Sequence, residues 1–322
     1  MGTLVVGVDA GATSTRCVVA TIDGTIVGRG VAGGANKNSS AFPPAASLGA
    51  ALDAALSSVE RRDVRIGVLG AAGSAGAGRD SFRAAAGAAW RQAGLSGEVV
   101  TVTDLEVGYA AGTAAPDGVL LLSGTGALAA RFSGGVLTRR VDGYGWLAGD
   151  EGSAVWIGIR ALRAALAALD GRGEPTVLVE AVRSELGVPP GHGEDLAQGL
   201  LAAGFAVPPA TLGRLAPLVS AAGDDPVARR ICAAAAAKLL HTFDTVQPAP
   251  ADAAVLAGSV LLSPGPIGGA VRAGIRERIG AEPSEAADGA AGAATLAIAR
   301  LTGNPVPADV HASLTGHEPT RE

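Results

Sequence analysis

The chain has 322 residues, a formal net charge of −5, 48% apolar residues and only 3% aromatic residues. A chain of this length exceeds what one small hydrophobic core organises, so we expect two domains. The mildly acidic balance gives no support for binding to nucleic acid or to an anionic membrane, because either partner requires a basic surface.

The N-terminal part of the chain predicts an α/β lobe. Residues 3–31 contain three apolar runs, and Asp23-Gly24 before the third run is typical of a hairpin turn. The elements that follow alternate in type, as they do in α/β domains. We expect strands at 3–8, 16–22, 25–31, 64–70 and 98–103, and helices near 45–60 and 80–93, the second capped by Asp80.

The C-terminal part begins near residue 117 with a repeat of the first three strands. Residues 119–141, like residues 3–31, consist of an apolar run, a tight Gly/Thr loop, a second run, a Gly turn and a third run. Residues 303–322 are expected to form a loose tail. We expect a strand at 253–258. One helix is expected at 153–169, a second that begins at Asp225-Pro226, a third that ends near residue 279 and a last one at 288–302.

The two cysteines and the N-terminus indicate a cytoplasmic protein. Cys17 and Cys232 stand far apart in Ala-rich surroundings, which favours buried small side chains over metal ligands. The first strand follows the N-terminus at once, with no basic segment ahead of an apolar one and no apolar run long enough to span a bilayer.

The two repeated loops, Asp9–Ser14 and Ser123–Ala127, carry the main functional signal of the sequence. Glycine lets a backbone approach a ligand closely, and Thr and Ser add hydroxyl donors. Neither loop has the Gly-Lys-Ser/Thr of a Walker A motif, so backbone N–H groups, hydroxyls and Mg²⁺ would have to meet phosphate charge. The pair predicts a two-lobed protein that binds ATP. Asp9 is a candidate Mg²⁺ partner through water or, alternatively, a turn-forming aspartate.

Acidic residues at the end of the strand 98–103 are candidates for catalysis. Asp104 ends this strand, and ligands of open α/β sheets lie beyond the carboxyl ends of the strands. Its carboxylate could accept a hydroxyl proton during phosphoryl transfer, and the alternative is an N-cap for a helix over 105–114. Glu106 adds a second carboxylate two residues further on.

The Gly-rich segment 142–152 carries a second group of polar and aromatic candidates. Asp150 and Glu151 precede a helix, where an acidic residue can also simply stabilise the helix dipole. Tyr144 and Trp146 stand between glycines, and the sequence does not decide whether their side chains contact a sugar or pack against other residues.

Taken in order, these residues resemble the N-acetylglucosamine kinase and BadF/BadG-type ATPase family of the acetate-kinase/actin/heat-shock-ATPase superfamily. The likeness extends over nearly the whole chain except its tail. The matching segments are Gly7–Thr13, Gly33–Asn36, Asp104, Ser123–Gly126, Gly145–Ser153 and Ala257–Ser259, of which Gly145–Ser153 is the most specific.

The resemblance implies an α/β fold of two ribonuclease-H-like lobes, with ATP and Mg²⁺ bound in a deep cleft between them. The first lobe would comprise 1–116 joined by the last helix, and the second 117–287. Asp104 would deprotonate the 6-hydroxyl of a sugar, and Asp9 would hold Mg²⁺. The implied nucleotide contacts are Gly11, Ala12, Thr13, Ser14, Gly124, Thr125, Gly126, Gly258 and Ser259, and the implied sugar contacts are Asn36, Gly73, Glu106, Trp146 and Asp150.

Departures from the family pattern suggest the substrate. Asn38 stands where N-acetylglucosamine kinases have an aromatic residue, Glu106 where they have a small one, and Ala127-Leu128 where the second phosphate loop usually has a polar residue. An additional carboxylate beside the sugar suits an ammonium group, and a charge-assisted hydrogen bond contributes about 1.5–3 kcal/mol. The sequence therefore favours a glucosamine kinase, provided that Asp104 and Glu106 share a face.

Other functions stay open at this point. The alternatives are an N-acetylglucosamine or broad hexose kinase and a non-catalytic module that senses sugar or nucleotide. An iron–sulfur activator ATPase is disfavoured because the chain lacks a suitable cysteine pair, and a repressor because no helix-turn-helix precedes the first strand. The expected partner is a small amino sugar, and a homodimer is possible.

Overall fold

The structure is a computed structural model that describes residues 2–11, 13–35, 44–71, 78–250 and 252–316. The chain divides into two compact units. The first unit contains Met1–Asp117, Phe132–Leu137 and Ser284–Glu322, and the second contains Gly118–Arg131 and Thr138–Pro283.

Two five-stranded sheets share one topology. The first has the order β3-β2-β1-β4-β5 and the second, taken from its other edge, β8-β7-β6-β9-β10. Strand β1 is parallel to β4, and the corresponding β6 is parallel to β9. The repeat predicted from the sequence is thus a repeat of the fold. The strands are β1 Leu4–Ala10, β2 Ser14–Thr21, β3 Ile26–Gly33, β4 Val64–Ala71, β5 Glu98–Thr103, β6 Gly118–Ser123, β7 Ala127–Ser133, β8 Val136–Asp142, β9 Ala253–Ala257 and β10 Ser284–Glu285.

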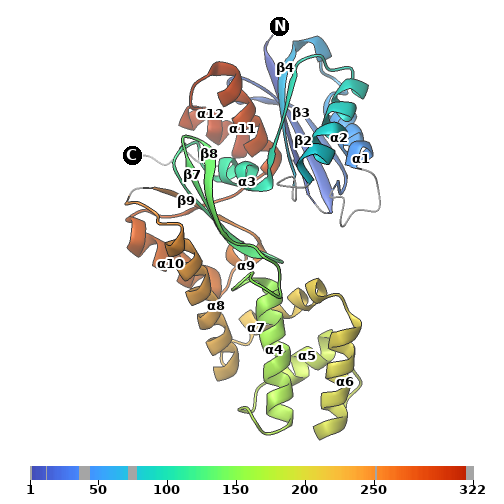
Figure 1. Cartoon of the computed structure of the whole chain (residues 1–322), viewed down its shortest axis with the longest axis vertical. Coiled ribbons are helices and arrows are strands. Elements are labelled where there is room, and N and C mark those ends of the chain that lie inside the picture. The colour runs from blue at the N-terminus through green and yellow to red at the C-terminus, as the bar shows by residue number, and fades with distance from the viewer. Residues whose placement is uncertain (1, 12, 36–43, 72–77, 251, 317–322) are drawn as a thin grey trace. The chain divides into compact units, whose positions relative to one another are not determined.

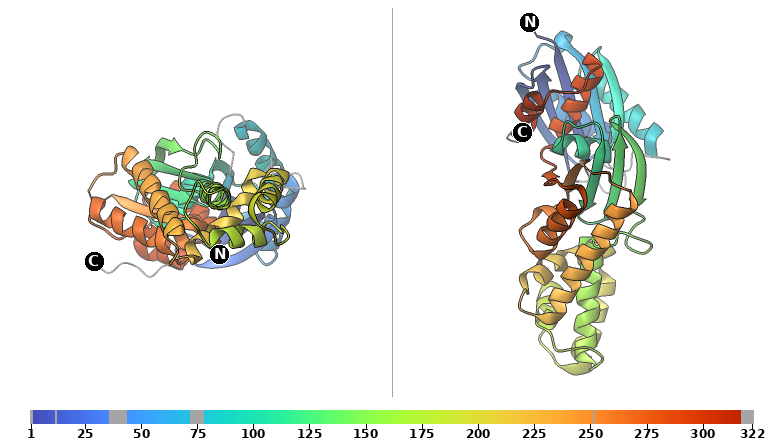
Figure 2. Two further views of the ribbon diagram at one scale, coloured as in Figure 1. Left: turned by 90° about the horizontal axis from the view of Figure 1, so that it is seen from below. Right: turned by 90° about the vertical axis from the view of Figure 1, so that its left-hand side faces the viewer.

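Helices cover both faces of the first sheet (Figures 1 and 2). Alternate residues of β1 and β2 pack on α1 and α2 on one face and on α11 and α12 on the other. Helix α11 lies unusually close to β1, since a Cβ added to Gly7 would lie 2.1 Å from the carbonyl oxygen of Ala290. The helices of this unit are α1 Pro44–Ala55, α2 Arg79–Gln92, α3 Asp104–Gly112, α11 Gly289–Thr302 and α12 Ala308–Thr315.

Helices dominate the second unit, which has one continuous core. The Ser153 hydroxyl caps α4 by accepting the N–H of Trp156 at 3.1 Å. Asp225 caps α8, with Pro226 at the first helical position as predicted, and α8 packs against α10 (Figure 1). The helices are α4 Ala154–Leu169, α5 Leu178–Glu185, α6 Gly193–Ala206, α7 Ala216–Ala221, α8 Pro226–Thr245, α9 Ser259–Leu262 and α10 Pro266–Ile279.

The structure corrects two sequence-based expectations. Asp80 lies inside the first turn of α2, whose N-cap is Gly78, so its side chain does not cap the helix. Residues 308–315 form α12 and are not a loose tail, because Leu314 joins the core and the buried His311 contacts the carbonyl oxygen of Ala110 at 2.8 Å.

The expectation for the two cysteines agrees with the structure. Cys17 and Cys232 are both buried and neither forms a disulfide bond. Among the helices that the structure describes, none is both long enough and apolar enough to cross a membrane.

Candidate active site

The carboxyl edge of the first sheet brings Asp9 and Asp104 into one neighbourhood. Asp9 of β1 is in register with Gly70 of β4, and Gly70 is in register with Val102 of β5. Asp104 follows Val102 by two residues at the same edge. Because neighbouring strands lie about 4.8 Å apart, the backbones of β1 and β5 are about 10 Å apart there. Both acidic residues thus lie at one edge of the same sheet.

Asp9 lies against the N-terminus of α11. A Cβ added to Gly289 would come within 2.4 Å of the Asp9 Oδ2, so only glycine leaves space for this carboxylate. Burial raises the pKa of Asp9, the guanidinium of Arg16 on β2 lowers it, and the charge of Asp288 raises it. Asp288 in turn caps α11 and pairs with Arg29 at 2.9 Å. No role for Arg16 or Asp288 was predicted from the sequence, although Asp288-Gly289 is typical of a helix start.

The first Gly/Thr loop folds into a tight turn at the end of β1. The N–H of Gly11 donates to the carbonyl of Ser14 at 2.9 Å, and the N–H of Ala35 donates to the carbonyl of Gly11 at 3.1 Å. Thr13 is exposed, so its hydroxyl can reach a ligand. Among the implied ligand contacts, Ala12, Asn36 and Gly73 lie outside the described residues.

Asp104 and Glu106 form the first turn of α3. Thr103 is the N-cap, Asp104 is the first helical residue and Glu106 is the third. The Glu106 Oε2 accepts the N–H and the hydroxyl of Thr103, each at 2.8 Å, which completes a capping box. The two acidic residues therefore lie on a helix and do not share a strand face, so the condition for pairing Glu106 with a sugar ammonium is not met. On a helix, residues two positions apart point in different directions.

The second Gly/Thr loop connects β6 to β7 and is hydrogen-bonded to the residues at the start of α4. The buried Ser123 hydroxyl donates to the carbonyl of Gly152 at 3.0 Å, and the N–H of Ala154 donates to the carbonyl of Gly124 at 2.8 Å. The N–H of Gly124 bonds the carbonyl of Gly126 at 2.9 Å, and Thr125 between them is exposed. This loop thus offers an accessible hydroxyl on a fixed turn, as the first loop does.

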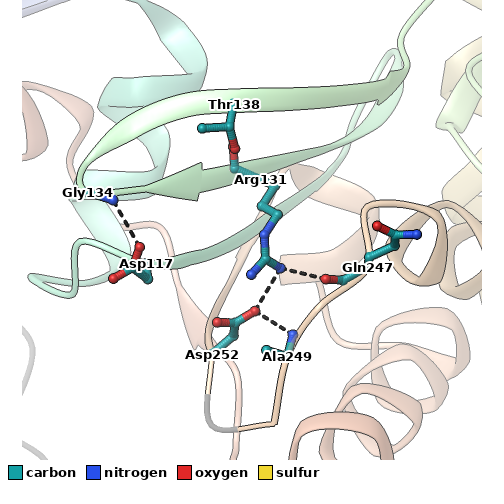
Figure 3. A network of polar contacts seen from close by, with 7 residues as sticks. All are labelled: Asp117, Arg131, Gly134, Thr138, Gln247, Ala249 and Asp252. Carbon is teal, nitrogen blue, oxygen red and sulfur yellow. Dashed lines mark hydrogen bonds and ion pairs between the residues drawn. The ribbon is translucent and has the colours of Figure 1, made fainter.

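The segment around Gly258 packs directly on this loop. Gly258 has φ 89°, and a Cβ there would lie 2.4 Å from the carbonyl oxygen of Ser123. Strand β9, which leads to Gly258, is anchored at its other end by Arg131 of β7 (Figure 3). Arg131 Nη1 donates to the carbonyl of Gln247 at 2.7 Å and to Asp252 Oδ2 at 2.9 Å.

A cavity of about 260 Å³ opens beside the second loop. Its walls come from α4, α7, α9 and the start of α10, and Ala154 and Ser259 lie on the side of the loop. The lining is mostly small and apolar, with three serine hydroxyls from Ser220, Ser259 and Ser263. Such a site suits a flat heteroaromatic group with a few polar edges.

Asp150 also lies against the second loop. It is buried and has φ 54°, and a Cβ added to Gly126 would lie 3.0 Å from its Oδ2. Burial raises the pKa of Asp150, while backbone hydrogen bonds from Ala127 and Gly145 lower it. The carboxylate therefore joins the loop of β6–β7 to the segment 143–149.

The aromatic residues of the segment 143–149 are exposed. Tyr144, Trp146 and Leu147 have 71%, 49% and 82% of their surface exposed, so none belongs to a core. Glu151 forms an ion pair with Lys238 at 2.9 Å, which gives this side chain a structural partner. Tyr144 and Trp146 are therefore both accessible to a ligand.

The residues present fit a Mg²⁺ ion held mainly by its nucleotide. Among the described residues, no group of three or more His, Cys, Asp or Glu could form a protein cage for a metal. Mg²⁺ keeps several waters and typically takes one or two carboxylates plus substrate phosphates. Asp9, with the space that Gly289 leaves beside it, meets that requirement.

The sequence of the chain matches one protein family over most of its length. The model of the BadF/BadG/BcrA/BcrD ATPase family matches residues 6–297. The chain belongs to this family. The family resemblance inferred from the motifs is thereby confirmed.

Individual relatives add detail. The N-acetylmuramic acid/N-acetylglucosamine kinase of Clostridium acetobutylicum is 37% identical over 106 residues, which are 33% of this chain and 35% of that protein. The chain thus matches about a third of the length of that relative.

Solved structures share the two-lobed fold. A protein of Chromobacterium violaceum, provisionally designated an N-acetylglucosamine kinase, has a TM-score of 0.71 and 25% identity over 92% of this chain and 99% of its own. A ROK family glucokinase of Streptomyces griseus, solved with glucose and AMPPNP, has a TM-score of 0.53 and 18% identity over 91% of this chain and 99% of its own. The predicted α/β fold of two related lobes is confirmed.

Proposed function

We propose that this protein is an ATP-dependent kinase that transfers the γ-phosphate to the 6-hydroxyl of a hexosamine. The observation that carries the proposal is the position of Asp104, one residue beyond β5 at the sheet edge where Asp9 lies near the end of β1. A protein that only senses sugar or nucleotide has no need of a base at that place.

In the proposed reaction the Asp104 carboxylate accepts the proton of the 6-hydroxyl. The freed oxygen attacks the γ-phosphorus, and the bond from this phosphorus to the oxygen that bridges it to the β-phosphorus breaks, releasing ADP. Such a transfer depends mainly on positioning and on neutralisation of charge. General-base help contributes roughly 10²–10⁴ in rate.

Each unit contains one Gly/Thr loop, and we propose that these loops bind the phosphates of ATP. Thr13 and Thr125 would donate hydroxyl hydrogen bonds to phosphate oxygens, together with the backbone N–H groups of the glycines. Asp9 would hold Mg²⁺ through water, and the ion would supply positive charge to the transferring phosphate. Adenine would enter the cavity beside Ser259.

The substrate within the hexosamines is proposed to be N-acetylglucosamine, with glucosamine second. The preference for glucosamine depended on a carboxylate of Glu106 facing the sugar, and that oxygen accepts two hydrogen bonds from Thr103 instead. The kinases of Clostridium acetobutylicum and Chromobacterium violaceum are named for N-acetylglucosamine, which supports the order proposed here. Trp146 and Asp150 would contact the sugar.

A substrate panel with Mg-ATP tests this proposal. N-acetylglucosamine, glucosamine, N-acetylmuramic acid and glucose would each be incubated with the protein, and ³¹P and ¹³C NMR would identify the product and the phosphorylated carbon. We expect hexosamine 6-phosphate and equimolar ADP, lost in Asp104→Asn. Binding of sugar and ATP without formation of ADP would refute the kinase and support the sensing module.

A further inference from the structure

The segment between β8 and α4 is held at both ends by aspartates in an unusual conformation. Asp142 has φ 66° and Asp150 has φ 54°. Among the described residues only three residues other than glycine have a positive φ, and the third, Gln247, lies in another part of the unit. Positive φ is unfavourable for residues with a Cβ, although Asp tolerates it better than most. Strain of this kind persists where the surroundings compensate for it.

The compensation at Asp142 comes from three backbone N–H groups. Its Oδ1 accepts the N–H of Gly143 at 2.8 Å and the N–H of Asp150 at 2.7 Å, and its Oδ2 accepts the N–H of Glu151 at 2.9 Å. The carboxylate therefore closes the segment 143–149 into a loop whose two ends meet at one side chain.

The Asp142 carboxylate lies close against Gly149, and Arg140 holds the backbone on either side of it. A Cβ added to Gly149 would lie 2.2 Å from its Oδ1 and 3.2 Å from the Cβ of Tyr144. The Arg140 guanidinium donates to the carbonyl of Asp142 at 3.2 Å and to the carbonyl of Gly143. Carboxylate and guanidinium thus hold the N–H and C=O groups of the same turn from two sides.

We propose that Asp142 is a positioning residue for the sugar site, which sets the loop 143–149 in its ligand-binding shape before the sugar arrives. This inference rests on the proposed function and extends it to a residue that touches neither substrate. The loop carries Trp146 in an exposed position, and its last bond fixes the backbone of Asp150. A loop that is already ordered loses less conformational entropy on binding, so the sugar binds more tightly.

Two variants separate the hydrogen bonds of Asp142 from its strain. Asp142→Gly removes the carboxylate and relieves the positive φ, whereas Asp142→Asn keeps one acceptor and turns an N–H₂ toward the N–H of Glu151. Each has a matched control in the same unit. Gln247→Gly relieves a positive φ elsewhere, and Asp225→Asn alters a carboxylate that also accepts three backbone N–H groups, those of Val177, Val227 and Ala228.

Steady-state kinetics and hydrogen exchange are the readouts. For Asp142→Gly we expect the KM for the sugar to rise roughly tenfold or more, with the KM for ATP within about twofold of wild type. Asp142→Asn should show a smaller rise, and neither control should change the KM for the sugar. Amide hydrogen exchange of residues 143–151 in the protein without ligands should accelerate in Asp142→Gly and stay unchanged in Gln247→Gly.

The outcomes distinguish this inference from the proposed function. If no sugar is phosphorylated by the wild type, the kinase proposal fails, while hydrogen exchange still reports whether Asp142 orders the loop. If exchange of 143–151 is the same in Asp142→Gly and wild type, the positioning role is refuted. Equal losses in the KM for sugar and for ATP would also refute it, because they indicate a general structural role.

Discussion

Glu106 binds Thr103 through one carboxylate oxygen, which accepts both the backbone N–H and the hydroxyl of that residue at 2.8 Å. This contact fixes the first turn of α3, and the first residue of that turn is Asp104. The carboxylate that seemed to select an amino sugar thus orders the helix end that carries the proposed base.

Replacing Glu106 by Ala should lower stability and reduce activity on all sugars alike. The loss of a capping box costs about 1 kcal/mol, and a frayed first turn displaces Asp104. Thermal unfolding and kcat/KM for glucosamine and N-acetylglucosamine would measure both effects. Glu106→Gln, which can still complete a capping box, should remain close to wild type. A selective loss for glucosamine in both variants would restore the ammonium role of Glu106.

Asp104→Asn should abolish catalysis without loss of binding. The amide cannot accept the hydroxyl proton, so kcat should fall by roughly 10²–10⁴. The substitution keeps the size of the side chain, and the capping box of Thr103 and Glu106 does not involve it. Calorimetric titration with sugar and with Mg-ATP should give dissociation constants near those of wild type. A kcat within about threefold of wild type would exclude Asp104 as the base.

Asp9→Asn should stabilise the protein without ligands and remove its response to Mg-ATP. Burial raises the pKa of Asp9, so the folded state holds the proton more tightly than the unfolded state does. The ionised form therefore disfavours folding above the folded-state pKa, and this penalty disappears below the unfolded pKa of about 3.9. At pH 7 the variant should melt at a higher temperature than wild type, whereas added Mg-ATP should raise only the wild-type melting temperature.

Asp23→Asn is the control of opposite sign for this prediction. Hydrogen bonds from Thr21 and Thr25 lower the pKa of the exposed Asp23, so its charged form favours the folded state. Its replacement should leave the melting temperature unchanged or slightly lower at pH 7, with the response to Mg-ATP intact. If the melting temperature of Asp9→Asn is likewise unchanged or lower, burial does not determine how ionisation of Asp9 affects folding stability.

Gly289→Ala should impair Mg²⁺-dependent activity by displacing Asp9. The new Cβ would lie 2.4 Å from Asp9 Oδ2, so the carboxylate must turn away from the end of α11. The concentration of Mg²⁺ needed for half-maximal activity should rise. Gly269→Ala, in helix α10 with nothing within 4 Å of the added Cβ, should increase stability by about 0.4–1 kcal/mol and leave activity unchanged. A Mg²⁺ dependence unchanged by Gly289→Ala would argue against Asp9 as the metal partner.

Filling the cavity beside Ser259 should weaken nucleotide binding selectively. Ser220 lines this cavity and is partly exposed, so Ser220→Phe adds bulk with little effect on the core. The KM for ATP should rise while the KM for the sugar stays unchanged. A matched substitution outside the cavity, Ser184→Phe on α5, should alter neither. An unchanged KM for ATP in Ser220→Phe would place the adenine elsewhere.

Much of the fold and part of the candidate site could be predicted from the sequence. Apolar runs interrupted by Gly/Thr loops are local patterns, so the repeated strands and the turns at Gly11 and Gly124 could be predicted from the sequence. The capping box of Thr103 and Glu106 was missed because Asp104 and Glu106 were considered at the end of a strand, whereas the structure places both in the first turn of α3. Asp142 was missed because its three partners include residues eight and nine positions away.

By itself the sequence determined the doubled α/β unit, the two phosphate-type loops and the family, because these depend on residue order and on short-range backbone preferences. Only the tertiary structure decided which residues far apart in the sequence come into contact. It brings Gly289 against Asp9 across 280 residues and Gly258 against Ser123 across 135 residues. Packing of distant helices and strands fixes such contacts, and no local pattern in the chain specifies them.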